Sequence, residues 1–143
     1  MKIKLTILAA FLPVLATGIF VVPARAGRIE PTPVSCWLFR GDKLELQQTC
    51  ISESHTWTGG GIRSLRWKDG VQTTMAWGLQ GRGERPCADT SIDAVCGVSY
   101  GRHPATLKRI SNAEREKLAS QSQPTISCVQ VQNKSVCWLR AVR

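Results

Sequence analysis

Residues 62–79, IRSLRWKDGVQTTMAWGL, decide the fold because they read as one long β-hairpin. Apolar and polar side chains alternate on both sides of the Lys-Asp-Gly sequence at 68–70, which is typical of strands with one buried face and one wet face. A three-residue loop, with Gly70 in the positive-φ position, places Leu65 opposite Thr73. A two-residue Asp-Gly loop would shift the pairing by one residue and mix the two faces. The predicted buried face carries Leu65, Trp67, Val71, Met75, Trp77 and Leu79.

A second hairpin is predicted at residues 34–51, with a two-residue turn at Gly41-Asp42. The turn sets two apolar pairs opposite each other: Trp37 with Leu46, and Phe39 with Leu44. The Arg-Gly-Asp sequence at 40–42 also matches an adhesion motif. Because a three-letter match is common by chance and a tight turn favours Gly-Asp, the turn is the preferred interpretation.

A third hairpin is predicted at residues 125–142. With Asn133-Lys134 as its turn, Val129 lies opposite Trp138 on an apolar side. Asn133 also begins an Asn-Lys-Ser sequence, which fits the N-glycosylation pattern on an exposed hairpin tip. The pattern therefore predicts a strand pair whose tip faces solvent.

The segments between the hairpins read as irregular. Residues 52–61 contain three successive glycines and predict a loop, in which Trp57 serves either as a lid on the core or as a ligand-stacking platform. Ser111 begins a Ser-Asn-Ala-Glu capping box, which predicts a short helix with a thin apolar stripe on the surface.

These elements together predict a mainly β fold: a small antiparallel barrel or sandwich built from three hairpins, with one short surface helix, stabilised by disulfides. The Cys-Trp-Leu sequences at 36–38 and 137–139 are alike. We expect these two strands, from opposite ends of the domain, to lie side by side and close the sheet.

Residues 1–26 are interpreted as a cleaved signal peptide. Lys2 and Lys4 precede an apolar run at residues 5–22, and the Ala-Arg-Ala sequence at 24–26 supplies the small-residue cleavage pattern. An uncleaved membrane anchor is the alternative, because a run of this length can just span a bilayer. Proline and glycine residues that interrupt the run favour cleavage.

Cleavage of 26 residues leaves 117 of the 143, enough for one domain with a modest core. We divide them into a linker at 27–33 and a single domain at 34–143. Cleavage also removes three basic residues and no acidic ones, so the net charge falls from +9 to +6. This excess favours an anionic partner: an acidic glycan, an anionic membrane surface or an acidic protein. Nucleic acid is not expected, because the basic residues are scattered and an exported chain seldom meets it.

Six cysteines follow the signal peptide, and an even number in a small exported domain predicts three disulfides, formed in the periplasm or outside the cell. The six are Cys36, Cys50, Cys87, Cys96, Cys128 and Cys137. No metal site is expected, because no Cys-x-x-Cys pair is present and the two histidines are not spaced as ligands.

Cys87 and Cys96 enclose eight residues and are the predicted local pair. The other four cysteines form either two local pairs or cross-links between the terminal hairpins. In the predicted registers Cys36 and Cys50 fall on opposite faces, so that a bond between them needs a bulge or a register shift. Cys128 and Cys137 are diagonal neighbours, which is a stretched arrangement for a disulfide.

The sequence offers little that indicates catalysis. Glu84, Asp89 and Asp93 are close in sequence and could form the carboxylate pair of a glycoside hydrolase, but solvated acids around a disulfide loop are the more ordinary explanation. Neither histidine stands in a recognisable nucleophile setting, and no cofactor fingerprint is present. We therefore expect no enzyme and no cofactor, with a small hydrolase as a remote alternative.

The expected function is a secreted or periplasmic, non-enzymatic binding module for an anionic surface, glycan or acidic protein. Its candidate ligand-binding residues lie in irregular segments, where binding residues are common: Arg82, Arg85, Arg102, His103 and Trp57. The alternative is an inhibitor or adaptor of an extracellular or cell-wall enzyme that presents the disulfide-held loop at 87–96. In size, compartment and β-rich composition the chain is similar to small exported inhibitors of cell-wall hydrolases.

Overall fold

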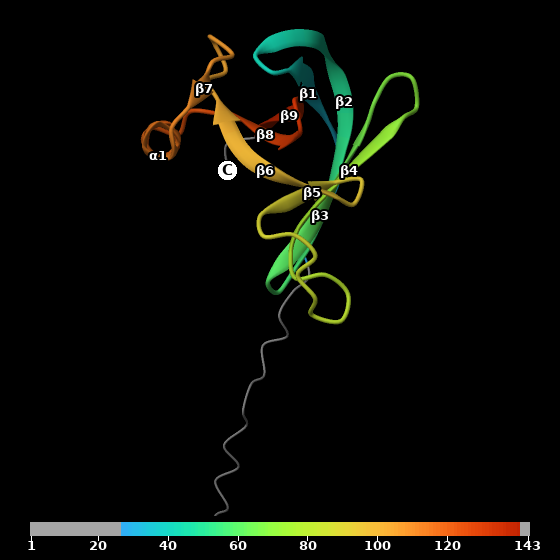
Figure 1. Cartoon of the computed structure of the whole chain (residues 1–143). Helices are drawn as coiled ribbons and strands as arrows, with labels where there is room; N and C mark the ends of the chain where they lie inside the picture. Colours follow the sequence, from blue (N-terminus) through green and yellow to red (C-terminus); the bar gives the residue numbers. More distant parts are fainter. Residues whose placement is uncertain (1–26, 141–143) are drawn as a thin grey trace, which may run out of the picture.

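The computed structural model describes residues 27–140 (Figure 1). The predicted signal peptide lies outside the described residues. The chain forms nine strands and one helix within this range: β1 (Gly27–Arg40), β2 (Lys43–Trp57), β3 (Gly60–Arg66), β4 (Gln72–Gly78), β5 (Thr90–Ile92), β6 (Val95–Arg102), β7 (Arg109–Ile110), α1 (Asn112–Ser120), β8 (Thr125–Val131) and β9 (Lys134–Arg140).

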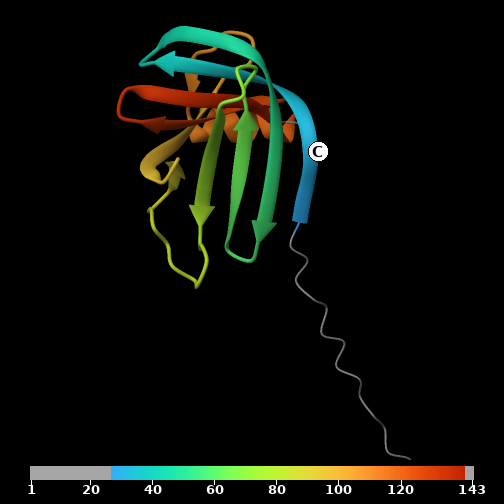
Figure 2. The same cartoon turned by 90° about the vertical axis from the view of Figure 1, so that its right-hand side faces the viewer.

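Eight of the strands close into an antiparallel barrel. The strand order is β5-β4-β3-β2-β1-β9-β8-β6, and pairing between β5 and β6 completes the ring. Figure 2 shows β1 to β4 side by side, with the β8–β9 hairpin crossing behind them. The short strand β7 pairs only with β6 and stands outside the ring. The predicted small, disulfide-stabilised β fold is confirmed, and its architecture is the barrel.

The β3–β4 hairpin has the predicted register. Leu65 lies opposite Thr73, and Gly70 closes the loop at a φ of 85°. The buried indole of Trp67 donates a hydrogen bond to the Thr73 hydroxyl at 2.9 Å. The predicted buried face needs one correction, because Val71 precedes β4 and is 57% exposed. Val71 directly follows the loop at the hairpin tip, and Thr73 is the first side chain of β4 that is buried.

The β1–β2 hairpin turns at Gly41-Asp42 as predicted, with Phe39 opposite Leu44. A β-bulge then shifts the register, so that Leu38 lies opposite Leu46. The predicted pairing of Trp37 with Leu46 is therefore wrong: Trp37 lies opposite Gln47.

The shift brings Cys36 and Cys50 to one face of the β1–β2 hairpin, where they form a disulfide with Cα atoms 5.9 Å apart. In the predicted register this bond needed a bulge or a register shift, and the observed bulge brings the two cysteines to the same face. Cys87 and Cys96 form the predicted local disulfide. All six cysteines are paired locally, which is consistent with an oxidising compartment.

The β8–β9 hairpin turns one residue earlier than predicted. Gln132, at a φ of 53°, begins the turn, and Val129 lies opposite Val136 instead of Trp138. Moving the turn by one residue moves the register by two, so the two faces of the hairpin are unchanged. Cys128 and Cys137 become directly opposite, with Cα atoms 4.1 Å apart, and their disulfide is not the stretched diagonal that was expected.

The two Cys-Trp-Leu sequences lie on neighbouring strands, as predicted. In the β1–β9 pair, Cys36 lies opposite Trp138 and Trp37 lies opposite Cys137. This contact joins the first described strand to the last and closes the barrel on that side. Similar sequences at both ends of the domain therefore mark the strands that meet.

The segment at 52–61, which was predicted to be a loop, consists mostly of strand. Residues 52–57 belong to β2 and residues 60–61 to β3, and residues 27–33, which we named as a linker, form the first half of β1. Only Thr58 and Gly59 turn between β2 and β3, with Gly59 at a φ of 83°. Gly61 lies within β3, and only glycine fits there because a Cβ at this position would clash with the Trp77 ring. These glycines mark a close approach of neighbouring elements, which is the other use of glycine in strands.

The molecule has two hydrophobic cores, one on each face of β1, β8 and β9. The inner core fills the barrel and contains Cys36, Cys50, Leu65, Trp67, Met75, Val129 and Val136. The outer core contains Trp37, Phe39, Ile126, Cys128 and Cys137, with Tyr100, Leu107 and Leu139 packed against it. In Figure 1, α1 and β7 lie together on one side of the barrel, beside β6 and β8. Alternation along β1 supplies both cores from one strand.

The predicted surface helix is confirmed as α1. The Ser111 hydroxyl accepts a hydrogen bond from the Glu114 amide at 3.1 Å, as in an N-cap, and Leu118 is the buried residue of the helix. Over residues 27–140, no helix is long and apolar enough to cross a membrane.

Candidate functional site

A groove of about 460 Å³ lies between the β1–β2 turn and the segment at 102–109. Its volume is within the range of known ligand sites. The lining combines three cations, one acid and an apolar surface: Arg102, Lys108, Arg109, Asp42, Phe39, Leu44, Leu107 and Thr106. The positive charges therefore outnumber the negative ones along its walls.

Two arginines face each other across a strand pair in this groove. Arg102 ends β6, Arg109 begins β7, and the two are directly opposite in the antiparallel register. Like charges directly opposite each other destabilise a strand pair unless an anion lies between them. The tight turn at 103–108 sets this pairing, because the His103 amide donates to the Lys108 carbonyl at 2.9 Å.

Arg102 is a buried residue of β6, whereas the sequence placed it in an irregular segment. Its side chain is 2% exposed. Its guanidinium donates to the Tyr100 hydroxyl at 3.2 Å, the Leu107 carbonyl at 2.7 Å and the Gly41 carbonyl at 3.2 Å. A further hydrogen bond of 3.0 Å reaches Asp42. These bonds satisfy most of the five donors of the guanidinium and fix its plane at the base of the groove.

Asp42 supplies the anion that the two arginines need. Its Oδ1 lies 3.0 Å from Arg102 Nη2 and 3.7 Å from Arg109 Nε. The Asp42 side chain is nevertheless 82% exposed, because it projects from the tip of the β1–β2 turn. One carboxylate thus neutralises two guanidinium groups only in part, and Lys108 adds a third positive charge.

Both aromatic rings beside the groove are covered by guanidinium groups. Arg102 lies over the Phe39 ring, 4.0 Å from its centroid, and Arg109 lies over the Tyr100 ring at 3.9 Å. These cation–π contacts hold the arginines in place. They also occupy the ring faces that a ligand would otherwise use for stacking.

His103 belongs to the turn below the groove. Its Nδ1 accepts a hydrogen bond from the Ala105 amide at 3.1 Å, and its carbonyl accepts one from Leu107, which has a φ of 59°. The imidazole therefore shapes the segment that carries Lys108 and Arg109. His103 is not among the residues that line the groove.

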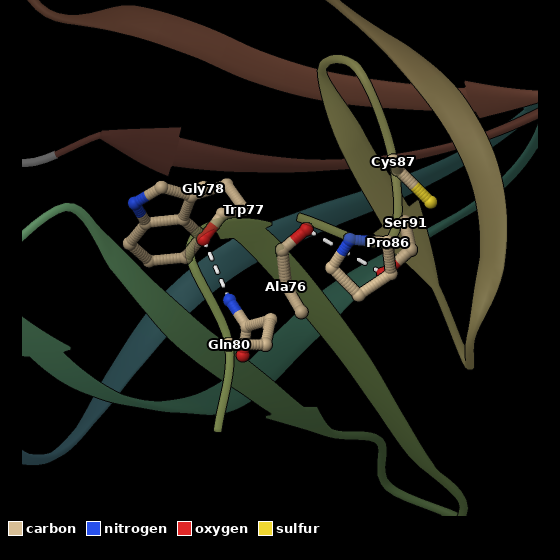
Figure 3. Close-up of a pocket in the computed structure, with 7 residues that line it drawn as sticks. All are labelled: Ala76, Trp77, Gly78, Gln80, Pro86, Cys87 and Ser91. Atoms are coloured by element: carbon tan, nitrogen blue, oxygen red, sulfur yellow. Dashed lines mark hydrogen bonds between the residues drawn. The ribbon is translucent and has the colours of Figure 1, made fainter. Parts of the chain in front are cut away.

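Arg82 and Arg85 lie in a different place, on the exposed loop that follows β4. Gln80 anchors this loop, since its side-chain amide donates to the Trp77 carbonyl at 2.6 Å (Figure 3). The cavity beside the loop measures only about 30 Å³ and is lined by Ala76, Trp77, Gly78, Gln80, Pro86, Cys87 and Ser91. A space of that size holds water and no larger ligand.

Trp57 lies at the end of β2 and is half-buried. Its indole donates to the Leu79 carbonyl at 2.7 Å, and its ring lies 5.8 Å from that of His55. The hydrogen bond joins the end of β2 to the segment after β4. Trp57 is thus remote from the lining of the groove.

The three carboxylates considered for hydrolysis have separate surroundings. Asp89 accepts hydrogen bonds from the amide and the hydroxyl of Ser99, and Asp93 accepts one from the Thr74 amide at 2.8 Å. Glu84 lies in the exposed loop after β4. In residues 27–140, no three His, Cys, Asp or Glu side chains gather as a group that could hold a metal ion.

Sequence reasoning missed three of the groove's charged residues: Asp42, Lys108 and Arg109. Asp42 and Arg102 meet across 60 positions of sequence, so no local pattern announces the contact. The adjacent basic residues at 108 and 109 were the available local signal.

No family model, curated protein or solved structure matches the chain.

Proposed function

We propose that the protein is an exported, non-enzymatic binding module that holds an anionic partner in the groove beside Arg102 and Arg109. The observation that carries this proposal is the cross-strand arginine pair, with one exposed carboxylate between its guanidinium groups. Guanidinium groups bind carboxylates and related anions through charge-assisted hydrogen bonds.

Three properties of the groove support this function. Its volume of about 460 Å³ suits a short segment of a larger partner. Phe39, Leu44 and Leu107 give it an apolar wall that can exclude water around charged contacts. The three local disulfides stabilise a barrel with a small core and are consistent with a location in an oxidising compartment.

Two double variants with the same charge change test the site. Lys108→Gln with Arg109→Gln removes two charges from the groove, and Arg82→Gln with Arg85→Gln removes two from the exposed loop. The probe is a labelled hexaglutamate peptide, titrated at low ionic strength. We expect the groove variant to bind about tenfold more weakly and the loop variant to retain most of the affinity. Equal losses would mean that only net charge matters, and the groove would not be the site.

An inhibitor or adaptor that docks on an extracellular enzyme is the second candidate, and the loop at 80–86 favours it. Within this loop, the Gln80 amide donates a hydrogen bond of 2.7 Å to the Glu84 carbonyl. The Cys87–Cys96 disulfide anchors the chain directly after it. A preorganised, exposed and basic loop suits insertion into an acidic cleft. Loss of probe binding in the loop variant alone would favour this candidate.

A further inference from the structure

We propose that the groove recognises an acidic polypeptide segment and that Asp42 is a built-in occupant, which the partner's carboxylate displaces. This inference rests on the proposed function and names its partner class and regulation. The geometry behind it is a carboxylate already seated between Arg102 and Arg109. Because the Asp42 carboxylate already lies between the two arginines, we expect them to bind a carboxylate of the partner as well.

The residues that follow Asp42 indicate a second feature that a bound peptide would have. Leu44, two positions later, also lines the groove together with Leu107, and its cross-strand neighbour is Phe39 of the outer core. The chain's own Asp-Lys-Leu sequence thus places one acid and one apolar side chain against the site. A partner with an acidic residue near an apolar residue would meet both kinds of surface.

The covered aromatic rings favour a polypeptide over a glycan. Sugar rings commonly pack their apolar faces on open aromatic faces, whereas Phe39 and Tyr100 each carry a guanidinium group. The aliphatic side chains of Leu44 and Leu107 remain as the apolar lining. Carboxylates with apolar neighbours fit this lining better than a polar saccharide does.

Asp42 is able to leave without dismantling the groove. Its side chain is 82% exposed, and the β1–β2 turn is held separately by a hydrogen bond of 2.6 Å from the Gly41 amide to the Asn133 carbonyl. Arg102 keeps its bonds to Tyr100, Leu107 and Gly41 after Asp42 departs. The arginine pair would then need another anion, because its two like charges stay directly opposite.

Asp42→Asn and Glu84→Gln form a matched pair for the test, since each raises the net charge by one and only the first lies in the groove. The probes are the hexaglutamate peptide, amidated at its C-terminus, and a galacturonate hexamer, which carries the same six carboxylates on a saccharide backbone. We expect Asp42→Asn to bind hexaglutamate about three- to tenfold more tightly than the wild type, because the competitor is removed. Glu84→Gln should change the affinity by less than about twofold.

The outcomes separate this inference from the proposed function. Equal affinities of the two variants, with a wild type that binds, would overturn displacement and leave the groove as the site. Tighter binding of the galacturonate hexamer would overturn the polypeptide class. A wild type that binds neither probe would overturn the proposed function as well. Should Asp42→Asn misfold, the carboxyl carbon resonance of Asp42 in the wild type decides: displacement predicts that it shifts on saturation with hexaglutamate, and a static resonance contradicts it.

Discussion

Arg102 and Asp42 are joined by a 3.0 Å ion pair that spans 60 positions of sequence and ties the end of β6 to the β1–β2 turn. One partner is buried and the other is exposed. The buried guanidinium positions the groove, and the exposed carboxylate marks where we propose that an anion binds. Arg102 therefore contributes mainly to the stability of the barrel, and Asp42 contributes to the binding that we propose.

Replacing Arg102 should destabilise the protein even though it lies on the outer face of the barrel. Arg102→Leu leaves the carbonyls of Leu107 and Gly41 without their donor, at a cost of about 2–3 kcal/mol in the free energy of unfolding. Arg102→Lys should recover only part of this, because an ammonium group cannot reproduce the planar fork. Urea unfolding measures the effect, and the exposed Arg82→Ala provides a control expected within about 0.5 kcal/mol of the wild type.

Replacing Ala94 by glycine should stabilise the protein. Ala94 has a φ of 68° in the two-residue turn between β5 and β6, where a side chain is strained. We expect Ala94→Gly to add about 1 kcal/mol to the free energy of unfolding and to raise Tm by about 4 °C. Ala105→Gly serves as the control at a position without positive φ. A lower Tm for Ala94→Gly would show that the turn carries no such strain.

Adding a methyl group at Gly61 should disrupt the packing of β3 against β4. The new Cβ would clash with the Trp77 ring and would also lie only 3.0 Å from the His55 carbonyl oxygen, so the ring and the strand must shift. We expect Gly61→Ala to cost about 1–3 kcal/mol and to change the near-ultraviolet circular dichroism of the tryptophans. Thr58→Ala, in the exposed turn nearby, should leave both measurements close to the wild type. An unaltered spectrum and stability in Gly61→Ala would contradict this close approach.

The carboxyl group of Glu45 should titrate at a lower pH than an ordinary glutamate. Arg40 donates a hydrogen bond to Glu45 at 2.6 Å and lowers the pKa of this carboxyl, with smaller contributions from the charges of Lys134 and Lys43. A group with a lowered pKa stabilises the folded state above its unfolded pKa, and this contribution disappears as the pH falls through the folded pKa. Carbon-detected NMR titration should therefore show the pKa of Glu45 rising in Arg40→Gln. An unchanged pKa would contradict the pairing.

Local patterns in the sequence were sufficient for most of the fold. Alternation around Gly70 predicts the register of β3 and β4, and the two Cys-Trp-Leu sequences predict the contact between β1 and β9. A direct Cys36–Cys50 bond was expected to need a bulge or a register shift, and the structure contains both the bond and a bulge. The first and the third of these rest on side chains that are neighbours along a strand or across one turn, whereas the second rests on the likeness of two sequences from opposite ends of the domain.

The errors arise where a residue's use depends on a distant partner. Glycines at 60 and 61 read as a loop, but Gly60 leaves space for the Leu79 backbone and Gly61 leaves space for the Trp77 ring. Arg102 reads as a loop cation, but Phe39 and the β1–β2 turn bury it. Asp42 was missed for the same reason: it lies 60 positions before Arg102, and the two side chains meet only in the folded barrel.

The most direct test of the proposed binding site is to map hexaglutamate on the uniformly ¹⁵N-labelled wild-type protein by NMR. We predict that the largest changes in backbone amide chemical shift occur at residues 39–44 and 102–109, on the two walls of the groove. The amides of the loop at 81–86 should remain close to their free positions. Shifts confined to that loop, or spread evenly over the basic surface, would contradict the assignment of the groove as the binding site.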